Sequence, residues 1–424
     1  MGEKNIVVIG ASYAGLLQSH SILRHIVPKL SNKYRVILIN SSPDFYFVIG
    51  APRAIVDEKS APDSRMFLPI TDGFKEYPKE SFQFIHGSVF DVDPVGRIVR
   101  YAGQGDSKQQ ITYHALVFAS GSKAPCPLLT AQPSTENTRA ALYSFRSFLP
   151  NARSIVIGGG GPCGVECAGE LAEFFSGSLQ PSSSSTSNAK IKITVVTNSN
   201  KLLPALSEEA ATRAEYYLRR LGVDVLYGKT VRETTPPDAG QTLGALFAKE
   251  GEPKIKVHLS DGQVLEADIY IPAFQGKPTT AYVPPALLTA SKHLNTNPET
   301  LRVDDAGPRV YAVGECSSAF KGGILTMVHM TQVVTTNLRR DLRAAEQGTE
   351  KPTAGVDRPF KPDLRPTQIV PIGSRHGVGQ FFGWWLPSFV IWLIKSRDFF
   401  IGSAKGNFLL GGYVKKESVW RKEQ

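Results

Sequence analysis

The sequence predicts an α/β fold with two Rossmann-like dinucleotide-binding domains and a smaller C-terminal α+β module. Two glycine-rich turns, each set between an apolar strand and a helical pattern, lie about 150 residues apart. The 424 residues suggest about three domain-sized units. The composition, 42% apolar and 20% charged, can fill a large core and excludes a disordered, collagen-like or coiled-coil chain.

The first glycine-rich turn follows an apolar, β-branched strand expected at residues 6–9. Gly10 allows the tight turn, and Gly15 lets the next helix pack close to the strand, so that the backbone amides between them can hold a pyrophosphate. Ser12 replaces the usual middle glycine and adds a hydroxyl donor. The next strand ends in Asn40, where a carboxylate for the adenosine ribose is usual, and an amide can still hydrogen-bond the hydroxyls. Taken alone, this turn could also be a strand–turn–helix unit without a ligand.

The second turn carries the complete pattern, with Gly159, Gly161 and Gly164 between a strand and a helix expected at 165–174. Two such motifs are far more specific than one. They predict two dinucleotide sites in one chain.

Two further strand ends complete the pattern. One, at residues 113–118, leads into Ser120 and Gly121, and the other, at 310–313, leads into Gly314 and Glu315. With these features the chain resembles the pyridine nucleotide–disulfide oxidoreductase superfamily over about residues 4–345. Within it, the chain is most similar to the apoptosis-inducing-factor-like branch that includes the ferroptosis suppressor proteins. The sequence segments that match this branch are Ala51-Pro52-Arg53-Ala54, the glycine-rich run that ends at Glu170, Lys201-Leu202-Leu203-Pro204 and Ile394-Lys395-Ser396-Arg397-Asp398.

The resemblance implies the cofactors and the domain order. FAD would occupy the first motif and NAD(P)H the second, and quinones would be reduced through FAD. The expected domains are an FAD-binding domain in two parts (1–125 and 266–345), an inserted NAD(P)H-binding domain (126–265) and a C-terminal interface or membrane-contact module (346–424). Two positions depart from the family pattern: Glu315 replaces an aspartate, and Gln275-Gly276 replaces a Thr-Gly turn.

The cysteines argue against a dithiol mechanism. No two of the four cysteines stand at C-x-x-C spacing, and we interpret all of them as structural: Cys126, Cys163, Cys167 and Cys316. Electrons would therefore leave the flavin directly for the acceptor. No metal site is expected.

The candidate catalytic residues follow from the resemblance, each with a plainer alternative. Glu166 matches an acid that related quinone reductases place near nicotinamide and flavin, but a first-turn glutamate is also favoured by the helix dipole. His329 and Gln332 are candidates for the acceptor side, and a buried, hydrogen-bonded histidine is the alternative. Arg53 would meet the FAD pyrophosphate or the acceptor, or form a surface salt bridge. Lys201, after a strand that lacks the acid typical of NAD sites, slightly favours NADPH.

The basic charge is concentrated near the C-terminus. Residues 351–424 hold 12 basic and five acidic side chains, so 12 − 5 = +7 of the formal net charge of +10 lies there.

We expect a linker at 347–365 and a low-complexity surface loop at 176–188. The tryptophan-rich run at 381–394 is too short to span a bilayer. With the basic residues that follow, segment 381–397 predicts either a flat contact with a membrane surface or a homodimer or interdomain seam.

Three functions remain open at this stage. The first is an FAD-dependent NAD(P)H oxidoreductase with a quinone-like acceptor. The second is a tailoring oxidoreductase on the same scaffold that acts on a soluble secondary metabolite, and the third is a basic, non-enzymatic binding flavoprotein.

No nucleic-acid-binding motif is present, so no nucleic acid is expected as a partner. The N-terminus shows no secretory signal, and Ile6 stands where a myristoylation pattern requires Ser or Thr. We therefore expect a cytoplasmic protein, or one peripheral on a membrane.

Overall fold

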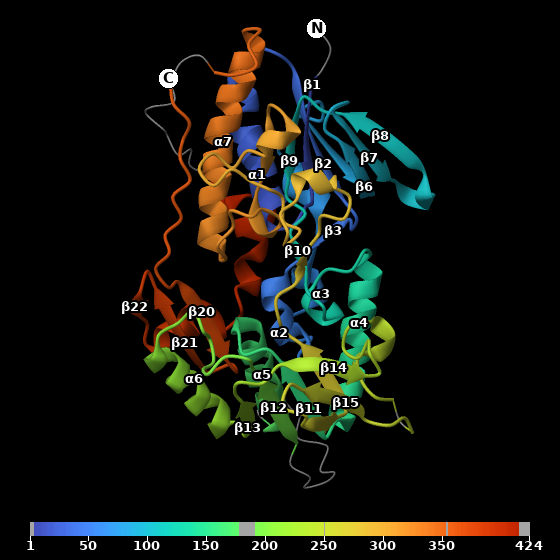
Figure 1. Ribbon diagram of the computed structural model, residues 1–424, viewed down its shortest axis with the longest axis vertical. Helices are drawn as coiled ribbons and strands as arrows, with labels where there is room; N and C mark the ends of the chain where they lie inside the picture. The colour runs from blue at the N-terminus through green and yellow to red at the C-terminus, as the bar shows by residue number, and fades with distance from the viewer. Residues whose placement is uncertain (1–3, 178–190, 250, 353–354, 415–424) are drawn as a thin grey trace.

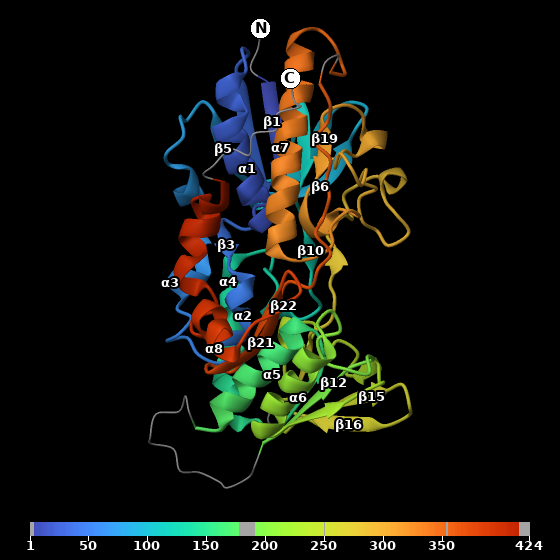
Figure 2. The same cartoon turned by 90° about the vertical axis from the view of Figure 1, so that its left-hand side faces the viewer.

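The computed structural model describes residues 4–177, 191–249, 251–352 and 355–414. The molecule is elongated, with an α/β layer at each end of its long axis (Figures 1 and 2). The predicted fold class is confirmed, because both layers are built on parallel sheets. Gly2, most of the serine-rich stretch, and the basic residues Lys415, Lys416, Arg421 and Lys422 lie outside the described residues.

The first layer is a five-stranded parallel sheet in the order β19-β9-β1-β2-β5. The last four residues of its central strand, Ile6 to Ile9, are apolar and buried because neighbours cover both edges and both faces. A chain segment from far along the sequence closes the sheet at β19. The strands are β1 (Lys4–Ile9), β2 (Tyr34–Asn40), β5 (Phe82–His86), β9 (Ala115–Phe118) and β19 (Val310–Ala312).

Helices α1 (Tyr13–His25) and α7 (Ile324–Glu346) pack together on one face of this sheet, and an antiparallel sheet lies on the other side (Figure 1). The antiparallel sheet consists of β6 (Ser88–Asp93), β7 (Ile98–Ala102) and β8 (Lys108–Thr112). Small elements between the layers are α2 (Ala51–Ala54), α3 (Asp63–Met66), β3 (Asp44–Tyr46), β4 (Phe67–Pro69), β10 (Ser122–Lys123) and β18 (Lys277–Pro278).

The second layer is a four-stranded parallel sheet in the order β13-β12-β11-β17. Its strands are β11 (Ser154–Gly158), β12 (Lys192–Val196), β13 (Val223–Leu226) and β17 (Ile269–Pro272). A three-stranded antiparallel sheet adjoins it, with β14 (Val231–Thr235), β15 (Ile255–Leu259) and β16 (Val264–Ala267). The helices of this layer are α4 (Thr135–Phe148), α5 (Pro162–Phe175) and α6 (Glu208–Arg220).

The C-terminal module packs against α5 and α6 (Figure 2). It is a small antiparallel sheet followed by a short helix and a wide, π-helical turn, η11 (Trp392–Ser396). The other elements are β20 (Gln368–Ile372), β21 (His376–Phe381), β22 (Trp384–Trp385) and α8 (Ser388–Ile391). Upstream of the module, Arg302 binds both Asp341 of α7 and Asp357, which fixes the chain at Asp357 to the first layer.

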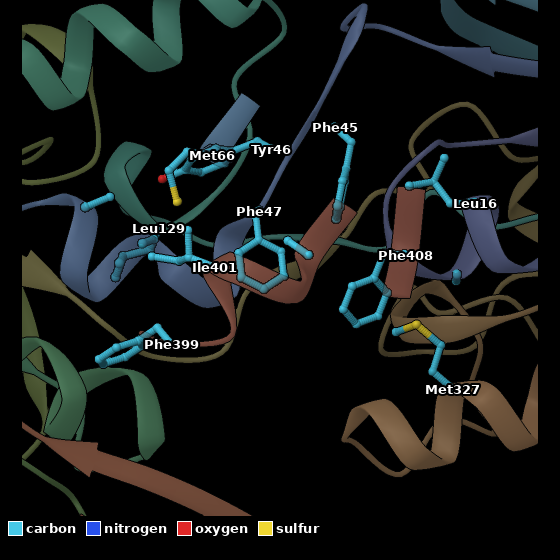
Figure 3. Packing of buried hydrophobic residues seen from close by; sticks show 14 of the residues in the cluster. Leu16, Phe45, Tyr46, Phe47, Met66, Leu129, Met327, Phe399, Ile401 and Phe408 are labelled. Atoms are coloured by element: carbon cyan, nitrogen blue, oxygen red, sulfur yellow. The ribbon is translucent and has the colours of Figure 1, made fainter. Parts of the chain in front are cut away.

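The chain after η11 returns to the first layer. Phe408 packs edge-to-face on Tyr13, with 4.8 Å between the ring centroids, and Figure 3 shows it beside Phe45 and Met327. The backbone carbonyl of Leu409 lies 2.8 Å from Nε2 of the buried His20. The described parts of the chain hold no helix long and apolar enough to cross a bilayer.

Candidate functional site

A cavity of about 920 Å³ lies between the two layers, within the usual size range of small-molecule and cofactor sites. The first glycine-rich turn forms one part of its wall. The turn after β9, the turn after β17 and the start of α7 form the rest. Because the carboxyl ends of parallel strands meet at one edge of a sheet, residues from distant sequence positions converge here.

The first turn is shaped by close backbone contacts that only glycine allows. Gly10 has φ +101°, and a Cβ on it would lie 2.5 Å from the carbonyl oxygen of Ala119. A Cβ on Gly15 would lie 1.7 Å from the carbonyl oxygen of Gly10, so α1 rests directly on the turn. Ser12 is the N-cap of α1, is exposed and lines the cavity. The free amides of the first turn of α1 lie beside these groups, which suits a pyrophosphate.

Asn40 also lines the cavity, at the end of β2. Its Oδ1 accepts a hydrogen bond from the amide of Ala11 at 2.9 Å, and its Nδ2 donates to the carbonyl of Ser42 at 2.8 Å. The amide side chain therefore ties the second strand to the glycine turn. One N–H of Asn40 is left to meet a ribose hydroxyl.

Ser120, Gly121, Gly276 and Glu315 come together in the cavity wall, although they are far apart in sequence. The hydroxyl of Ser122 donates to the carboxylate of Glu315, and Ser120 donates to the carbonyl of Thr279 at 2.7 Å. The longer glutamate at position 315 is thus held by a serine that sequence reasoning did not select. Gly314 precedes it with φ +75°, and a Cβ on it would meet the methyl group of Ala14 at 3.0 Å.

The second glycine-rich turn repeats the design of the first. Gly159 has φ +132°, and a Cβ on Gly164 would lie 1.9 Å from the carbonyl oxygen of Gly159. Gly161, the N-cap of α5, differs from Gly159 and Gly164, because a Cβ at position 161 would meet nothing within 4 Å. Packing within the protein therefore does not require a glycine at position 161. The close approach of a ligand is a reason for glycine there. Lys201 donates from Nζ to the carbonyl of Leu206 at 2.7 Å, so its ammonium is already engaged.

Glu166 lies on α5, is buried and accepts a hydrogen bond of 2.6 Å from Nζ of Lys395. Burial raises the pKa of Glu166, and the ammonium of Lys395 opposes that rise. Lys395 belongs to η11 and follows directly on the exposed apolar residues Trp392, Leu393 and Ile394. The pair was not predicted, because its members are 229 residues apart. The only sign of the pair in the sequence was that the segment Ile394–Asp398, which contains Lys395, matches the related branch.

Arg53 is buried and does not line the cavity wall. Its guanidinium binds both carboxylate oxygens of Glu170 on α5, and Nη2 also donates to the carbonyl of Ser396 at 3.0 Å. The expected alternative of a surface salt bridge is therefore wrong, because this ion pair lies in the interior. Its observed partners are the helix and the C-terminal module, not a pyrophosphate-binding turn.

His329 and Gln332 lie on α7 away from the cavity wall, which this helix reaches through Met327. The ring of His329 lies 5.1 Å from that of Phe360, and burial lowers its pKa. Oε1 of Gln332 accepts a hydrogen bond from Arg358 at 3.3 Å. Both side chains thus contact the segment that leads to the C-terminal module. Among the described residues, no group of three or more His, Cys, Asp or Glu side chains could hold a metal ion.

The cavity fits a dinucleotide in shape and chemistry. The tight glycine turn, the free amides at the start of α1, the amide of Asn40 and the Ser122–Glu315 pair supply the donors and acceptors that FAD requires. The aromatic and aliphatic side chains of Tyr13, Phe45, Phe274 and Met327 supply apolar wall.

Comparisons with known proteins agree with this geometry. Residues 4–336 match the family model for pyridine nucleotide-disulphide oxidoreductases. The chain is 39% identical to the oxidoreductase phnG of Penicillium herquei over 95% of both chains, and 24% identical to human ferroptosis suppressor protein 1 over 95% of both. Its fold matches that of the sulfide:quinone oxidoreductase of Aquifex aeolicus, with TM-score 0.66, 16% identity and coverage of 97% of this chain and 92% of the other.

The chain therefore belongs to the pyridine nucleotide-disulphide oxidoreductase family, whose members use FAD and NAD(P)H. The predicted superfamily, the branch that includes ferroptosis suppressor protein 1 and the two cofactors are confirmed. The protein is an oxidoreductase.

The open space around Gly161 yields a direct test of the second glycine turn. In Gly161→Ala the fold should persist, with a melting temperature within about 2 °C of wild type, because the new methyl group meets no protein atom. The dissociation constant for NAD(P)H should rise at least tenfold, about 1.4 kcal/mol, because the methyl group obstructs the pyrophosphate. Titration of the FAD-loaded protein measures this. Gly244→Ala, which also meets nothing within 4 Å, is the matched control, and unchanged NAD(P)H affinity in Gly161→Ala would contradict the assignment.

Proposed function

We propose that this oxidoreductase takes reducing equivalents from NAD(P)H through FAD and passes them directly to an apolar, quinone-like acceptor. The observation that carries the proposal is the Glu166–Lys395 pair. It joins the helix that starts at the second glycine turn to an exposed apolar segment of the C-terminal module. An acceptor held by that segment would have a proton-exchanging pair beside it.

The chemistry of quinone reduction matches this pair. FAD, held by the first glycine turn, Asn40 and Glu315, would supply the two-electron chemistry that links NAD(P)H to the acceptor. A quinone that becomes a hydroquinone also takes up two protons, so groups that hold protons near neutral pH are needed at the acceptor. Burial raises the pKa of Glu166, which favours its protonated form, and the adjacent ammonium of Lys395 can donate a hydrogen bond to a developing oxyanion.

The cysteines support direct transfer rather than a dithiol relay. Cys126, Cys167 and Cys316 are buried, and burial raises the pKa of the Cys126 thiol to about 12. Such thiols are poor nucleophiles. Cys163, the fourth, lines the cavity and has no cysteine at C-x-x-C spacing.

An apolar acceptor and a membrane surface fit the same part of the molecule. Seven large apolar side chains of the C-terminal module are between 37% and 77% exposed, and we name them the aromatic patch. They are Phe381, Trp384, Trp385, Phe389, Trp392, Leu393 and Ile394. The exposed Arg397 and Lys405 follow it in sequence. Tryptophan beside basic side chains is favoured where a protein lies on an anionic bilayer.

We infer that NADPH is accepted at the second turn. The residues after β12, Thr197 to Lys201, contain no carboxylate to repel a 2′-phosphate. Lys201 would have to release the carbonyl of Leu206 to bind that phosphate, and Asn198 and Ser199 offer neutral donors beside it.

The proposed function is tested by anaerobic reduction followed by an acceptor screen. The purified protein should be yellow and should lose its colour on addition of one equivalent of NADPH. Quinones should restore the colour, whereas disulfide substrates should not, because no dithiol relay is present. A colourless protein, or one whose reduced flavin passes electrons to disulfides but not to quinones, would contradict the proposal. Turnover confined to soluble, non-quinone metabolites would favour the tailoring oxidoreductase instead.

Removal of Lys395 should change the pH dependence of turnover. Lys395 opposes the rise in the pKa of Glu166, so in Lys395→Met that pKa should rise further. Because Glu166 can give up a proton only while it is protonated, its pKa sets the alkaline limb of the pH–rate profile, and this limb, measured by stopped flow with quinone, should move to higher pH. Lys395→Arg retains the cation and should keep the wild-type profile, and Glu166→Gln should remove the limb. A Lys395→Met profile that overlays the wild type would show that the pair does not control turnover.

The aromatic patch makes a separate prediction about membranes. Trp384→Ala/Phe389→Ala removes its two most exposed side chains and should lower the partition coefficient onto anionic vesicles at least tenfold. Co-sedimentation measures this, and added salt should weaken wild-type binding because basic side chains contribute. Tyr143→Ala, a similarly exposed side chain on α4, is the control and should bind like wild type. Loss of a dimer in light scattering, without loss of vesicle binding, would assign the patch to a subunit contact.

A further inference from the structure

The hydroxyl of Tyr13 is a hydrogen-bond donor at the cavity wall whose hydrogen is not used by the protein. Tyr13 is the first residue of α1, directly after the N-cap Ser12, and it lines the cavity. Its phenol oxygen accepts a hydrogen bond of 3.1 Å from the backbone amide of Ile49. Among the described residues, none accepts the hydrogen of this hydroxyl. A phenol can accept and donate at once, so the donor of Tyr13 is available to a ligand.

Aromatic neighbours from both ends of the chain hold the ring of Tyr13 in one orientation. Phe45 of β3 packs edge-to-face on it, with 5.1 Å between the ring centroids, and Phe408 does the same at 4.8 Å. Phe47 adds a third contact at 6.1 Å. These rings and the amide of Ile49 together fix where the phenol oxygen lies. The donor is therefore in place before any ligand binds.

The phenol of Tyr13 stays protonated. Burial raises its pKa, the amide of Ile49 opposes that rise, and the carboxylate of Glu315 adds to it. Tyr13 is therefore a neutral donor at every pH at which the enzyme would work. A donor that is shielded from water and lacks an acceptor costs free energy, so a ligand that supplies the acceptor binds more tightly.

The surroundings of Tyr13 indicate which part of FAD it meets. The amides at the start of α1 suit the pyrophosphate, and Asn40 suits the adenosine ribose. Tyr13 instead shares its part of the wall with the apolar side chains of Phe45, Val48 and Met327. Figure 3 shows Phe45 and Met327 on the same side of the core. The isoalloxazine is the flat, largely apolar part of FAD that fits such a wall, and its edge carries oxygens and nitrogens that accept hydrogen bonds.

We propose that Tyr13 donates a hydrogen bond from its hydroxyl to the isoalloxazine of FAD and thereby raises the midpoint potential of the bound flavin. The reduced ring is richer in electrons than the oxidised ring, so a donor at its polar edge stabilises the reduced form more. The proposal concerns the cofactor of the family and not the acceptor. It therefore goes beyond the proposed function and can be tested without a quinone.

The primary test is a reductive titration of the FAD-loaded protein against a reference dye, with no acceptor present. Tyr13→Phe removes the donor and keeps the ring that packs on Phe45 and Phe408. The preference of the site for reduced over oxidised FAD should fall about tenfold, which lowers the midpoint potential of a two-electron couple by about 30 mV. Tyr46→Phe is the matched control, because Tyr46 also lines the cavity but its hydroxyl already donates to the carbonyl of Leu128 at 3.3 Å. The potential of Tyr46→Phe should equal that of wild type.

A binding measurement on the full chain freed of its flavin identifies the part of FAD that Tyr13 meets. In Tyr13→Phe the dissociation constant for oxidised FAD should rise about threefold to tenfold, the usual effect of one hydrogen bond between neutral groups. The dissociation constant for ADP should not change, because ADP has the pyrophosphate but no isoalloxazine. Equal losses of affinity for FAD and ADP would place the donor at the pyrophosphate and overturn the proposal.

A ring-fluorinated tyrosine at position 13 keeps the test decisive if loss of the hydroxyl, which accepts from Ile49, unfolds Tyr13→Phe. Fluorine makes the phenol more acidic and a stronger donor, so the midpoint potential should rise above that of wild type. An unchanged potential in the fluorinated protein or in Tyr13→Phe would overturn the proposal. The same decrease in Tyr46→Phe as in Tyr13→Phe would also overturn it, because the effect would then come from the cavity wall in general. Failure of quinone reduction with these potentials as expected would count against the proposed function alone.

Discussion

The architecture depends on three buried carboxylates along one side of α5. Glu166 binds Lys395, Glu170 binds Arg53, and Glu173 accepts hydrogen bonds from the backbone and hydroxyl of Ser374. All three glutamates are at most 6% exposed. Removal of the cation from either buried ion pair, Lys395 from Glu166 or Arg53 from Glu170, would leave a carboxylate without its partner in the interior, at a cost of several kcal/mol. One helix thereby fixes the second layer to α2, which lies between the layers, and to the C-terminal module.

This constraint also determines what surrounds the cavity between the layers. The first turn of α5 lies at the cavity through Cys163, while the next turns face the C-terminal module. Arg53 holds the carbonyl of Ser396, the residue next to Lys395, so the Arg53–Glu170 pair orients the backbone that presents Lys395 to Glu166. The chain then returns to the first layer, where Phe408 packs behind the cavity-lining Tyr13 (Figure 3). Cofactor site and C-terminal module are therefore parts of one packed unit.

The sequence was most informative where structure is local. A strand, a glycine turn and a helix occupy consecutive residues, so Gly10, Gly15, Gly159 and Gly164 could be placed before any coordinates. The side chains that pair with the helix after the second turn were harder to predict, because Lys395 meets Glu166 across 229 residues and a single sequence does not show which distant residues pair. His329 was selected for its place on the helix after Glu315. Helical phase instead carries its ring to Phe360, because the cavity side of α7 is taken by Met327.

The wide turn of η11 explains how one short segment can serve both surface and interior. In a regular α-helix, residues i and i+4 share a face, so Trp392 and Ser396 would point the same way. A π-helical turn contains an extra residue per turn and breaks that relation. Trp392 is accordingly 41% exposed, whereas Ser396 is fully buried and donates from its hydroxyl to the carbonyl of His376. The aromatic patch can therefore face outward while the next residues, Lys395 and Ser396, reach the ion pairs of α5.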